Sequence, residues 1–262
     1  MTALVREKLL SLVRAFFVLA PLALVSSARA AGVPNDCTQL IVGSAPGWNS
    51  MRGQLQLFER SARDSWRCSG PSMPVLFGKN GLAWGRGLAG QEEEGLRKRE
   101  RDGRAPAGVF EIGKIYTYDA ALPAGANYPF HQVTKADAWI DDATRPDYNR
   151  FVTIEDAAHP PPWFAKEKMR HQDFAYRWLV EIRHNSDPPR PNEGSAIFFH
   201  IRRGSARPTT GCTTMAERDL VRLITWLRAD HHPCYALLPR ATYAQKAPAW
   251  HLPAPDLLAR DN

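Results

Sequence analysis

A cysteine and a histidine twelve residues apart are the side chains of this sequence best suited to chemistry. Cys212 lies in the segment PTTGCTT directly before a predicted helix, and His200 lies at the end of a predicted buried strand. Free amides and the positive dipole end at a helix start favour a thiolate. Since a thiolate beside a base is nucleophilic, the sequence predicts Cys212 as a nucleophile and His200 as its general base.

The residues around this pair leave two interpretations open. Gly211 lets the backbone approach closely enough for amides to receive an oxyanion. In the alternative, Cys212 is a buried or disulfide-bonded cysteine and His200 a satisfied core histidine. The other three cysteines allow one disulfide and leave one spare thiol. Cys37, Cys68 and Cys234 allow three pairings. Cys37 and Cys234 flank the first and last predicted strands, so they are favoured if those strands are neighbours in the sheet, and the sequence does not decide among the pairings.

The first thirty residues have the pattern of a secretory signal. Basic residues precede an apolar run of 11 residues at 15–25, and Ala28-Arg29-Ala30 offers a small-x-small cleavage site. The run is shorter than the roughly 20 residues that span a bilayer, so a retained anchor is the weaker alternative. We therefore expect residues 1–30 to be a signal peptide and the mature protein to be exported, periplasmic or cell-wall associated.

Charge limits the partners of the mature chain. Cleavage after Ala30 removes four basic residues and one acidic residue and leaves 232 residues, so the formal net charge falls from +7 to +4. A residual +4 is a mild bias toward anionic surfaces such as cell-wall polymers, and it is too small to indicate nucleic-acid binding. A secreted binder of anionic polymer driven by charge alone is the last-ranked interpretation.

The elements that must position the pair are mostly strands. The chain is 44% apolar and 23% charged, as in an ordinary globular protein. A helix is predicted over 215–228, because one of its faces would carry Leu220, Leu223, Ile224 and Leu227. Thr214 and Glu217 are its predicted capping box. Periodicity and turn residues predict strands at 38–44 and 54–58 as antiparallel neighbours, at 75–77 followed by a hairpin at 78–81, and at 107–112, 174–183, 195–201 and 234–238.

Three further segments lack such patterns. Residues 85–103 are predicted to be a charged surface loop. The functional alternative is that they form a flap over a substrate groove. Residues 117–162 are expected to be mostly loop with short elements. Residues 31–239 are predicted to form one catalytic domain, and 240–262 a Pro/Ala-biased, loosely docked tail.

The combined motifs resemble a known family. His200, the run Thr210-Gly211-Cys212 and the segment RAPAGVF at 104–110 resemble the YkuD-type L,D-transpeptidases of bacterial cell walls. Residues 78–81 and 141–149 are also similar to a divergent branch, and the likeness covers about 38–239. It implies a mainly β fold, an L,D-transpeptidase-like β-sandwich with one helix after the catalytic cysteine. It also implies that a peptidoglycan stem peptide forms a thioester with the cysteine and passes to an amine of another stem, without cofactor or metal.

The resemblance also implies roles for individual residues. Cys212 takes the nucleophile position, His200 that of the base, and the backbone carbonyl of Ile201 orients the base. The amides of Gly211 and Cys212 would form the oxyanion hole. The sequence departs from the family where Thr210 replaces a motif histidine, where Thr214 replaces an arginine, and in its shorter spacing of twelve. The candidate substrate-binding residues are Thr210, Arg202, Arg203, Tyr148 and Asn149, with Arg207 as a further substitute for the arginine and Trp139 as a further groove residue.

Other functions and ligands remain open at this stage. The same thiol could serve an L,D-carboxypeptidase or endopeptidase that gives the thioester to water. A catalytically silent wall-binding protein is the alternative from another class. His184-Asn185 is expected to be an exposed turn, although it could contact a ligand. His231-His232 has no third ligand at suitable spacing, so no metal site is predicted.

Overall fold

The computed structural model describes residues 32–61 and 65–259, so the predicted signal peptide at 1–30 lies outside the described residues. Most elements of the described residues are strands. The strands are β1 Gln39–Ala45, β2 Arg52–Glu59, β3 Arg67–Cys68, β4 Met73–Leu76, β5 Leu82–Trp84, β6 Ala105–Thr117, β7 Phe130–Gln132, β8 Asp137–Trp139, β9 Phe151–Thr153, β10 Trp178–Ile182, β11 Phe198–Ile201, β12 Thr213–Met215 and β13 Cys234–Pro239. The α-helices are α1 Phe164–Glu167, α2 Glu217–Trp226 and α3 Arg240–Lys246, and short 3₁₀ turns lie at Phe174–Tyr176, Ala229–His231 and Pro255–Leu257.

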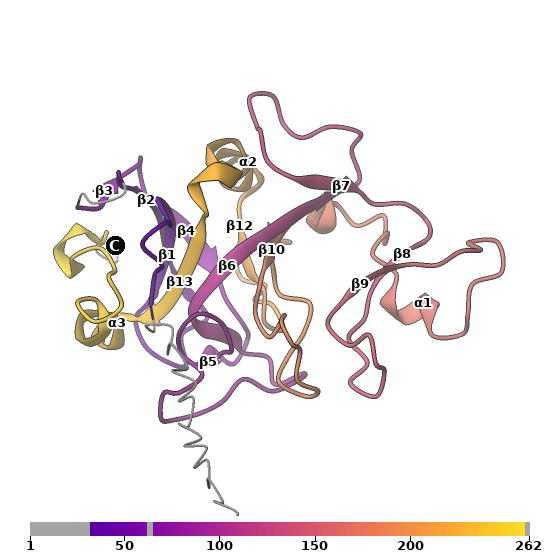
Figure 1. The fold of residues 1–262 in the computed structure, drawn as a ribbon, viewed down its shortest axis with the longest axis horizontal. Helices are drawn as coiled ribbons and strands as arrows, with labels where there is room; N and C mark the ends of the chain where they lie inside the picture. The colour runs from indigo at the N-terminus through magenta and orange to yellow at the C-terminus, as the bar shows by residue number, and fades with distance from the viewer. Residues whose placement is uncertain (1–31, 62–64, 260–262) are drawn as a thin grey trace, which may run out of the picture.

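The strands close into a mixed β-barrel (Figure 1). The hydrogen-bonded order is β1-β13-β6-β10-β11-β12-β4-β2, and β2 pairs with β1 to complete the ring. β1 and β2 are antiparallel neighbours, as predicted, whereas β1 with β13 and β11 with β12 are parallel pairs. The predicted mainly β class is therefore confirmed.

Apolar side chains on α2 and the inward faces of the strands fill the barrel core. All seven residues of β1 are buried, and Leu220, Leu223 and Ile224 of α2 have no exposed surface, as the helical periodicity predicted. The predicted capping box is wrong, because α2 begins after Ala216 and no side chain caps it. Thr214 instead belongs to β12, where its hydroxyl donates to the Leu76 carbonyl at 3.4 Å.

The predicted hairpin at 78–81 is a turn between strands that do not pair with each other. The Gly81 amide donates to the Gly78 carbonyl at 2.8 Å, but β4 pairs with β2 and β12, and β5 pairs with β6. A Cβ at Gly81 would lie 2.2 Å from the Trp48 carbonyl oxygen, and one at Gly78 would lie 2.4 Å from that of Gly103. The neighbouring segments therefore enclose the turn and send its two strands in different directions.

The predicted strand at 174–183 is a strand only in its second half. Residues Phe174–Tyr176 form a 3₁₀ turn, which the Asp173 carboxylate caps by accepting from the Ala175 amide. Phe174 is 59% exposed, so it does not share the buried face of β10 that alternation along 174–183 would give it. The alternating core face begins at Trp178, where β10 starts.

The C-terminal segment is part of the domain, so the expectation of a loosely docked tail is wrong. Tyr243 of α3 is fully buried, and Trp250 is 4% exposed. The Tyr243 hydroxyl donates to the Pro253 carbonyl at 2.9 Å, and the Val33 amide donates to the Trp250 carbonyl at 3.0 Å. Apolar side chains at intervals along 243–258 thus hold this segment to the barrel.

A lobe of short elements lies on one side of the barrel. Residues 117–162 are mostly loop, as predicted, with β7, β8 and β9 within them, and the lobe continues through α1 to the 3₁₀ turn at 174–176. Figure 1 shows β8, β9 and α1 on the side of the molecule opposite α3. No helix among the described residues is both long and apolar enough to cross a membrane. The lobe meets the barrel through a cluster of buried side chains made by Tyr116, Val133, Trp139, Met169, Leu179 and Phe198.

Candidate active site

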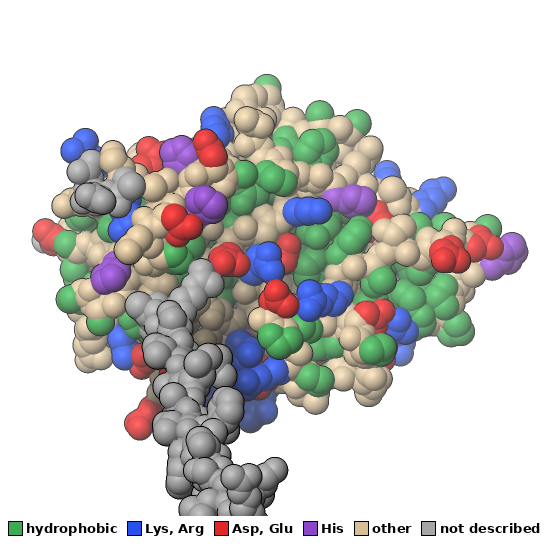
Figure 2. All heavy atoms as spheres, in the orientation of Figure 1, with side chains coloured by type: hydrophobic (Ala, Val, Ile, Leu, Met, Phe, Trp, Pro, Cys, Tyr) green, Lys and Arg blue, Asp and Glu red, His purple; other side chains and the backbone are tan. Residues whose placement is uncertain are grey.

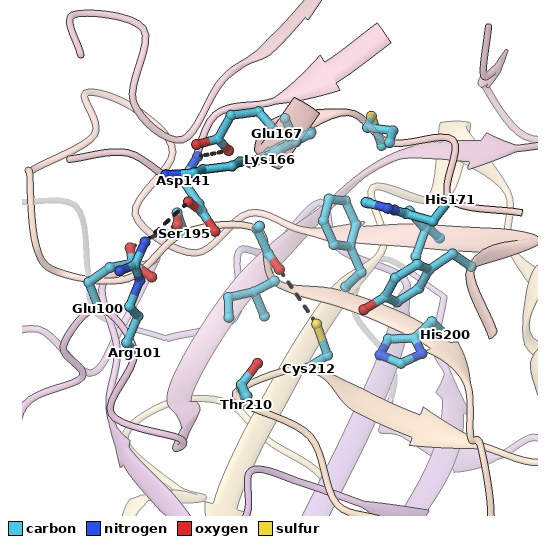
Figure 3. A pocket seen from close by; sticks show the side chains of 18 of the residues that line it. Glu100, Arg101, Asp141, Lys166, Glu167, His171, Ser195, His200, Thr210 and Cys212 are labelled. Atoms are coloured by element: carbon cyan, nitrogen blue, oxygen red, sulfur yellow. Dashed lines mark hydrogen bonds and ion pairs between the residues drawn. The ribbon is translucent and has the colours of Figure 1, made fainter. Parts of the chain in front are cut away.

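A cavity of about 470 Å³ lies between the barrel and the lobe, and the predicted pair opens into it. Cys212 and His200 line it from the barrel side (Figure 3). Trp139 and Met169 line it from the lobe, and Lys98 from the charged segment 85–103. The flap alternative for residues 85–103 therefore has structural support, since part of this segment forms a wall of the cavity.

Neighbouring parallel strands bring the cysteine and the histidine together. His200 lies in β11 opposite Thr214 of β12, and Cys212 directly precedes β12. The Cys212 thiol donates to the Ala196 carbonyl at 3.5 Å. Because β12 separates Cys212 from α2, the sulfur does not lie at the start of a helix, and the predicted help from a helix dipole is wrong.

The Cys212 thiol is neutral at rest. Burial raises the pKa of this thiol to about 11, while the Phe198 amide and the positive charges of Lys98 and Arg203 oppose that rise. Removal from water disfavours the thiolate more than these groups favour it. A thiolate at Cys212 therefore needs a base or additional positive charge.

The His200 imidazole is held in one orientation by the backbone. Nδ1 donates to the Ile201 carbonyl at 2.9 Å, so Nδ1 carries the proton of the neutral ring and Nε2 carries the lone pair. The Ala175 backbone is a second hydrogen-bonding neighbour of the imidazole. The Tyr176 ring packs edge-on against the imidazole with centroids 5.1 Å apart. Burial and the nearby Arg203 lower the pKa of His200 to about 4, although the Ile201 carbonyl opposes this shift. The Ile201 carbonyl thus lies where the family resemblance expects an orienting group.

Thr209, which the sequence reasoning did not identify, organises the loop that carries Cys212. Its hydroxyl accepts from the Gly211 amide at 3.1 Å and donates to the Cys212 carbonyl at 2.6 Å. The Gly211 amide is therefore already engaged, and the Cys212 amide is what remains of the predicted oxyanion hole. A threonine two residues before a glycine is a known turn-forming signal that could have indicated this role.

Gly211 is closely packed. A Cβ at this position would lie 3.1 Å from both the Arg104 carbonyl oxygen and Cδ1 of Ile197. A larger residue would need these neighbours to move by a few tenths of an ångström. The glycine of the Thr-Gly-Cys run therefore lies in close contact with the RAPAGVF segment at 104–110.

The predicted substrate-binding residues divide into three groups. Thr210 is exposed and lines the cavity. Arg203 is held by the Asp173 carboxylate at 2.5 Å and lies over the Tyr176 ring, so its charge acts on the site from behind that ring. Neither Arg203 nor Arg202 lines the cavity, contrary to the prediction. The Arg202 amide donates to the Met215 carbonyl.

Tyr148 and Asn149 form the third group, which is buried behind the cavity wall. Tyr148 is 2% exposed and donates to the Glu100 carboxylate. The Asn149 side-chain oxygen accepts from Trp139 Nε1 and from the Ala196 amide, both at 3.0 Å. Neither residue lines the cavity, contrary to the prediction. Asn149 instead fixes Ala196, whose carbonyl receives the Cys212 thiol.

The lobe side of the cavity carries carboxylates that the sequence reasoning did not single out as ligands. Glu167 accepts from the Asp141 amide at 2.9 Å. Burial raises the pKa of Glu167, and the nearby Asp141 carboxylate adds to the rise, although the Asp141 amide opposes it. A further carboxylate, Glu100 of segment 85–103, lines the cavity and accepts from the Ser195 hydroxyl at 2.8 Å. These groups were not recognisable in the sequence, because they lie on segments far apart in the chain.

Two histidine candidates outside the cavity have other roles. His184 and Asn185 are buried, so the expected exposed turn is wrong. His184 Nδ1 accepts from the Arg86 amide, and Nε2 donates to the Glu193 carbonyl. Within residues 32–61 and 65–259, His231-His232 belongs to no group of three His, Cys, Asp or Glu side chains arranged to hold a metal ion.

Comparison with protein-family models, with curated proteins and with solved structures finds no match for this chain.

Proposed function

We propose that this protein is a peptidoglycan L,D-transpeptidase, a cysteine acyltransferase exported to the cell wall. One observation carries the proposal. Cys212, directly before β12, and His200 of the neighbouring parallel strand β11 line one cavity, and the Ile201 carbonyl holds Nδ1–H, which leaves Nε2 as the nitrogen that would accept a proton. The Thr210-Gly211-Cys212 run and the likeness of 104–110 to the YkuD-type family add support. The family resemblance implies a β-sandwich, whereas the strands of this protein close into a barrel.

The reaction would proceed through a thioester. Nε2 of His200 takes the Cys212 proton as the sulfur bonds to the carbonyl carbon of a stem peptide. The tetrahedral oxyanion then collapses, the peptide C–N bond breaks, and the imidazolium returns its proton to the leaving amine. An amine of a second stem attacks the thioester and releases the thiol. Because the thiol and the imidazole are both neutral at rest, the first proton moves during attack rather than before it.

A silent wall-binding protein is the second candidate function. The raised pKa of the Cys212 thiol and the engaged Gly211 amide favour it, since both reduce the capacity for acyl transfer. A third outcome keeps the thioester but passes the acyl group to water, as in a carboxypeptidase or endopeptidase. All three share the cavity and differ in the fate of the bound stem.

Mass spectrometry of muropeptides separates these candidates. The protein without residues 1–30 is incubated with purified tetrapeptide and pentapeptide stems, beside Cys212→Ala and the matched control Cys68→Ala at an exposed free cysteine. Dimers that need Cys212 but not Cys68 support transpeptidation. Shortened stems without dimers identify a hydrolase. Unchanged stems that bind equally to Cys212→Ala protein overturn the enzymatic proposal.

A further inference from the structure

Lys98 reaches the active-site cavity beside two glycines. Its side chain is 3% exposed, although it lies in the charged segment 85–103. A Cβ at Gly194 would lie 3.0 Å from Lys98 Cγ, so the absence of a side chain at Gly194 makes room for the lysine stem. A Cβ at Gly211 would lie 3.7 Å from Lys98 Cε, which places the end of the stem within van der Waals contact of the residue that precedes Cys212.

The ammonium at the end of this stem is fixed in place. It donates to the Asp102 carboxylate at 2.6 Å and to the Arg99 carbonyl at 2.5 Å. Asp102 also accepts from the amides of Arg99 and Arg104, so the carboxylate is itself anchored to the backbone. A charge held in this way stabilises a developing anion without reorganising first.

The site needs such a charge because its other expected sources are absent or engaged. The start of α2 lies beyond β12, and the Gly211 amide donates to Thr209. Arg203, like Lys98, is paired with a carboxylate, that of Asp173, and it lowers the pKa of the Cys212 thiol less than Lys98 does. His200, the remaining titratable neighbour, is uncharged at neutral pH.

The remaining charged groups of the cavity are of mixed sign. Glu100 and Arg101 line it from segment 85–103, and Lys79 lines it from the preceding turn. Figure 3 shows Glu100, Arg101, Asp141, Lys166 and Glu167 gathered at the end of the cavity away from Cys212. The lobe contributes Asp141, Lys166, Glu167, Lys168 and His171.

We propose that Lys98 is a positioning residue of this site, and that its fixed ammonium stabilises the negative charge that forms on the Cys212 sulfur. The inference rests on the proposed role of Cys212 as a nucleophile. The charge of Lys98 acts to lower the pKa of the Cys212 thiol against the effect of burial, which agrees with this role. Lys98 would thereby replace what a helix start was predicted to supply.

Alkylation of Cys212 as a function of pH tests the inference without any cell-wall substrate. Iodoacetamide is the probe, peptide mass spectrometry reports Cys212, and the exposed Cys68 in the same chain is the internal reference. Lys98→Met keeps the stem and removes the charge. We expect the Cys212 profile to move to higher pH and its rate at pH 8 to fall roughly threefold or more, with Cys68 unchanged. Lys98→Arg keeps the wild-type profile.

A second variant distinguishes charge from structural support. Asp102→Asn removes the anion that offsets the ammonium, so the Cys212 profile should move to lower pH. Loss of packing would instead move both variants in one direction. The inference is overturned if Lys98→Met leaves the profile unchanged, or if both variants shift alike. Should Lys98→Met fail to fold, an unchanged or upward shift in Asp102→Asn overturns it.

This test and the muropeptide test fail independently. A Lys98-dependent thiol in a protein that leaves stems unchanged would count against the proposed function alone. If the protein forms stem dimers but the pH profile of Cys212 alkylation does not change in Lys98→Met, the result would count against the inference alone.

Discussion

At the scale of single residues, burial sets the protonation of the groups that could do chemistry. His200 and His184 are both buried and both have backbone partners, yet only His200 lines the cavity. Residue type alone made both of them candidates. What separates them is that both ring nitrogens of His184 are hydrogen-bonded to the backbone at 2.9–3.1 Å, whereas the hydrogen bond of His200 at 2.9 Å engages Nδ1.

His184 should make the stability of the fold depend on pH. Burial lowers the pKa of His184 to about 3, below the value of about 6.5 expected in the unfolded chain. The unfolded chain therefore binds a proton first as the pH falls, so the stabilisation is complete above pH 6.5 and is lost progressively toward pH 3. Urea unfolding at pH 7, 5.5 and 4.5 measures the loss.

His184→Gln is the variant that isolates this effect. Glutamine cannot titrate, so the variant should be less stable than wild type at pH 7 and should lose less stability on acidification. His159→Gln, at a histidine whose side chain is 87% exposed, is the matched control. Equal pH slopes in wild type and His184→Gln would contradict the assignment.

At the scale of elements, the short strand β12 and the loop before it determine the geometry of the site. β12 places Cys212 beside β11 and away from α2. The loop is attached to the end of β4, because Thr209 donates its amide to the Phe77 carbonyl and accepts from the Lys79 amide. The cysteine is therefore positioned by a strand edge and an anchored turn.

Thr209→Val should reduce acyl transfer because it removes the hydroxyl that joins Gly211 to Cys212. Valine has the same shape but leaves the Gly211 amide and the Cys212 carbonyl without their partner. We expect stem dimer formation to fall roughly tenfold or more, since the loss of a hydrogen bond of about 1 kcal/mol adds to misplacement of the nucleophile. Thr209→Ser keeps the hydroxyl and should remain near wild type. Similar losses in both variants would show that the hydroxyl is not the cause.

At the scale of the whole molecule, residues far apart in sequence close one barrel and cover it. β1 and β13 pair although they lie near opposite ends of the described chain. The segment after β13 also contacts the N-terminal end, where the Val33 amide donates to the Trp250 carbonyl. Figure 2 shows Lys and Arg side chains interspersed with Asp and Glu on the face in view, without one dominant basic patch. The two ends of the described chain are thus joined through the sheet and through the C-terminal segment.

Trp250→Ala should destabilise the fold strongly. The Trp250 side chain is buried and packs against Trp84 with ring centroids 6.2 Å apart. Its loss would leave a large cavity, so we expect the free energy of unfolding to fall by about 3 kcal/mol or more. Leu257→Ala, at a position 40% exposed in the same segment, is the control and should cost much less. If urea denaturation shows that both variants lose equally little free energy of unfolding, the C-terminal segment is a loosely docked tail after all.

Cys37 and Cys234 should form a disulfide when the protein is oxidised. Both are free and buried, Cys234 lies opposite Leu40 in the β1–β13 pairing, and the neighbouring Cys37 thiol raises the pKa of the Cys234 thiol. A bond between them would close a loop of most of the chain and stabilise it by about 5 kcal/mol in the chain-entropy model. Peptide mapping after oxidation in a glutathione buffer checks the pairing. A bond that includes Cys212 would contradict both this expectation and the proposed function.

The sequence by itself determined the elements with local periodicity. The strands around 39–45, 52–59 and 198–201 and the buried face of α2 follow from alternation and helical spacing, which depend only on neighbouring residues. The sequence also identified Cys212 and His200 as candidates, because both lie at the ends of predicted elements beside turn-forming residues.

Only the tertiary structure decided how these elements meet. The barrel closure, the insertion of β12 between Cys212 and the helix, and the burial of Lys98 depend on pairings between distant segments. The same is true of Asn149. It is buried, and its side-chain oxygen accepts from Trp139 and Ala196, which lie in other parts of the chain. Local residue patterns do not encode such contacts, since the burial of a polar side chain depends on which remote segment covers it and supplies its partners.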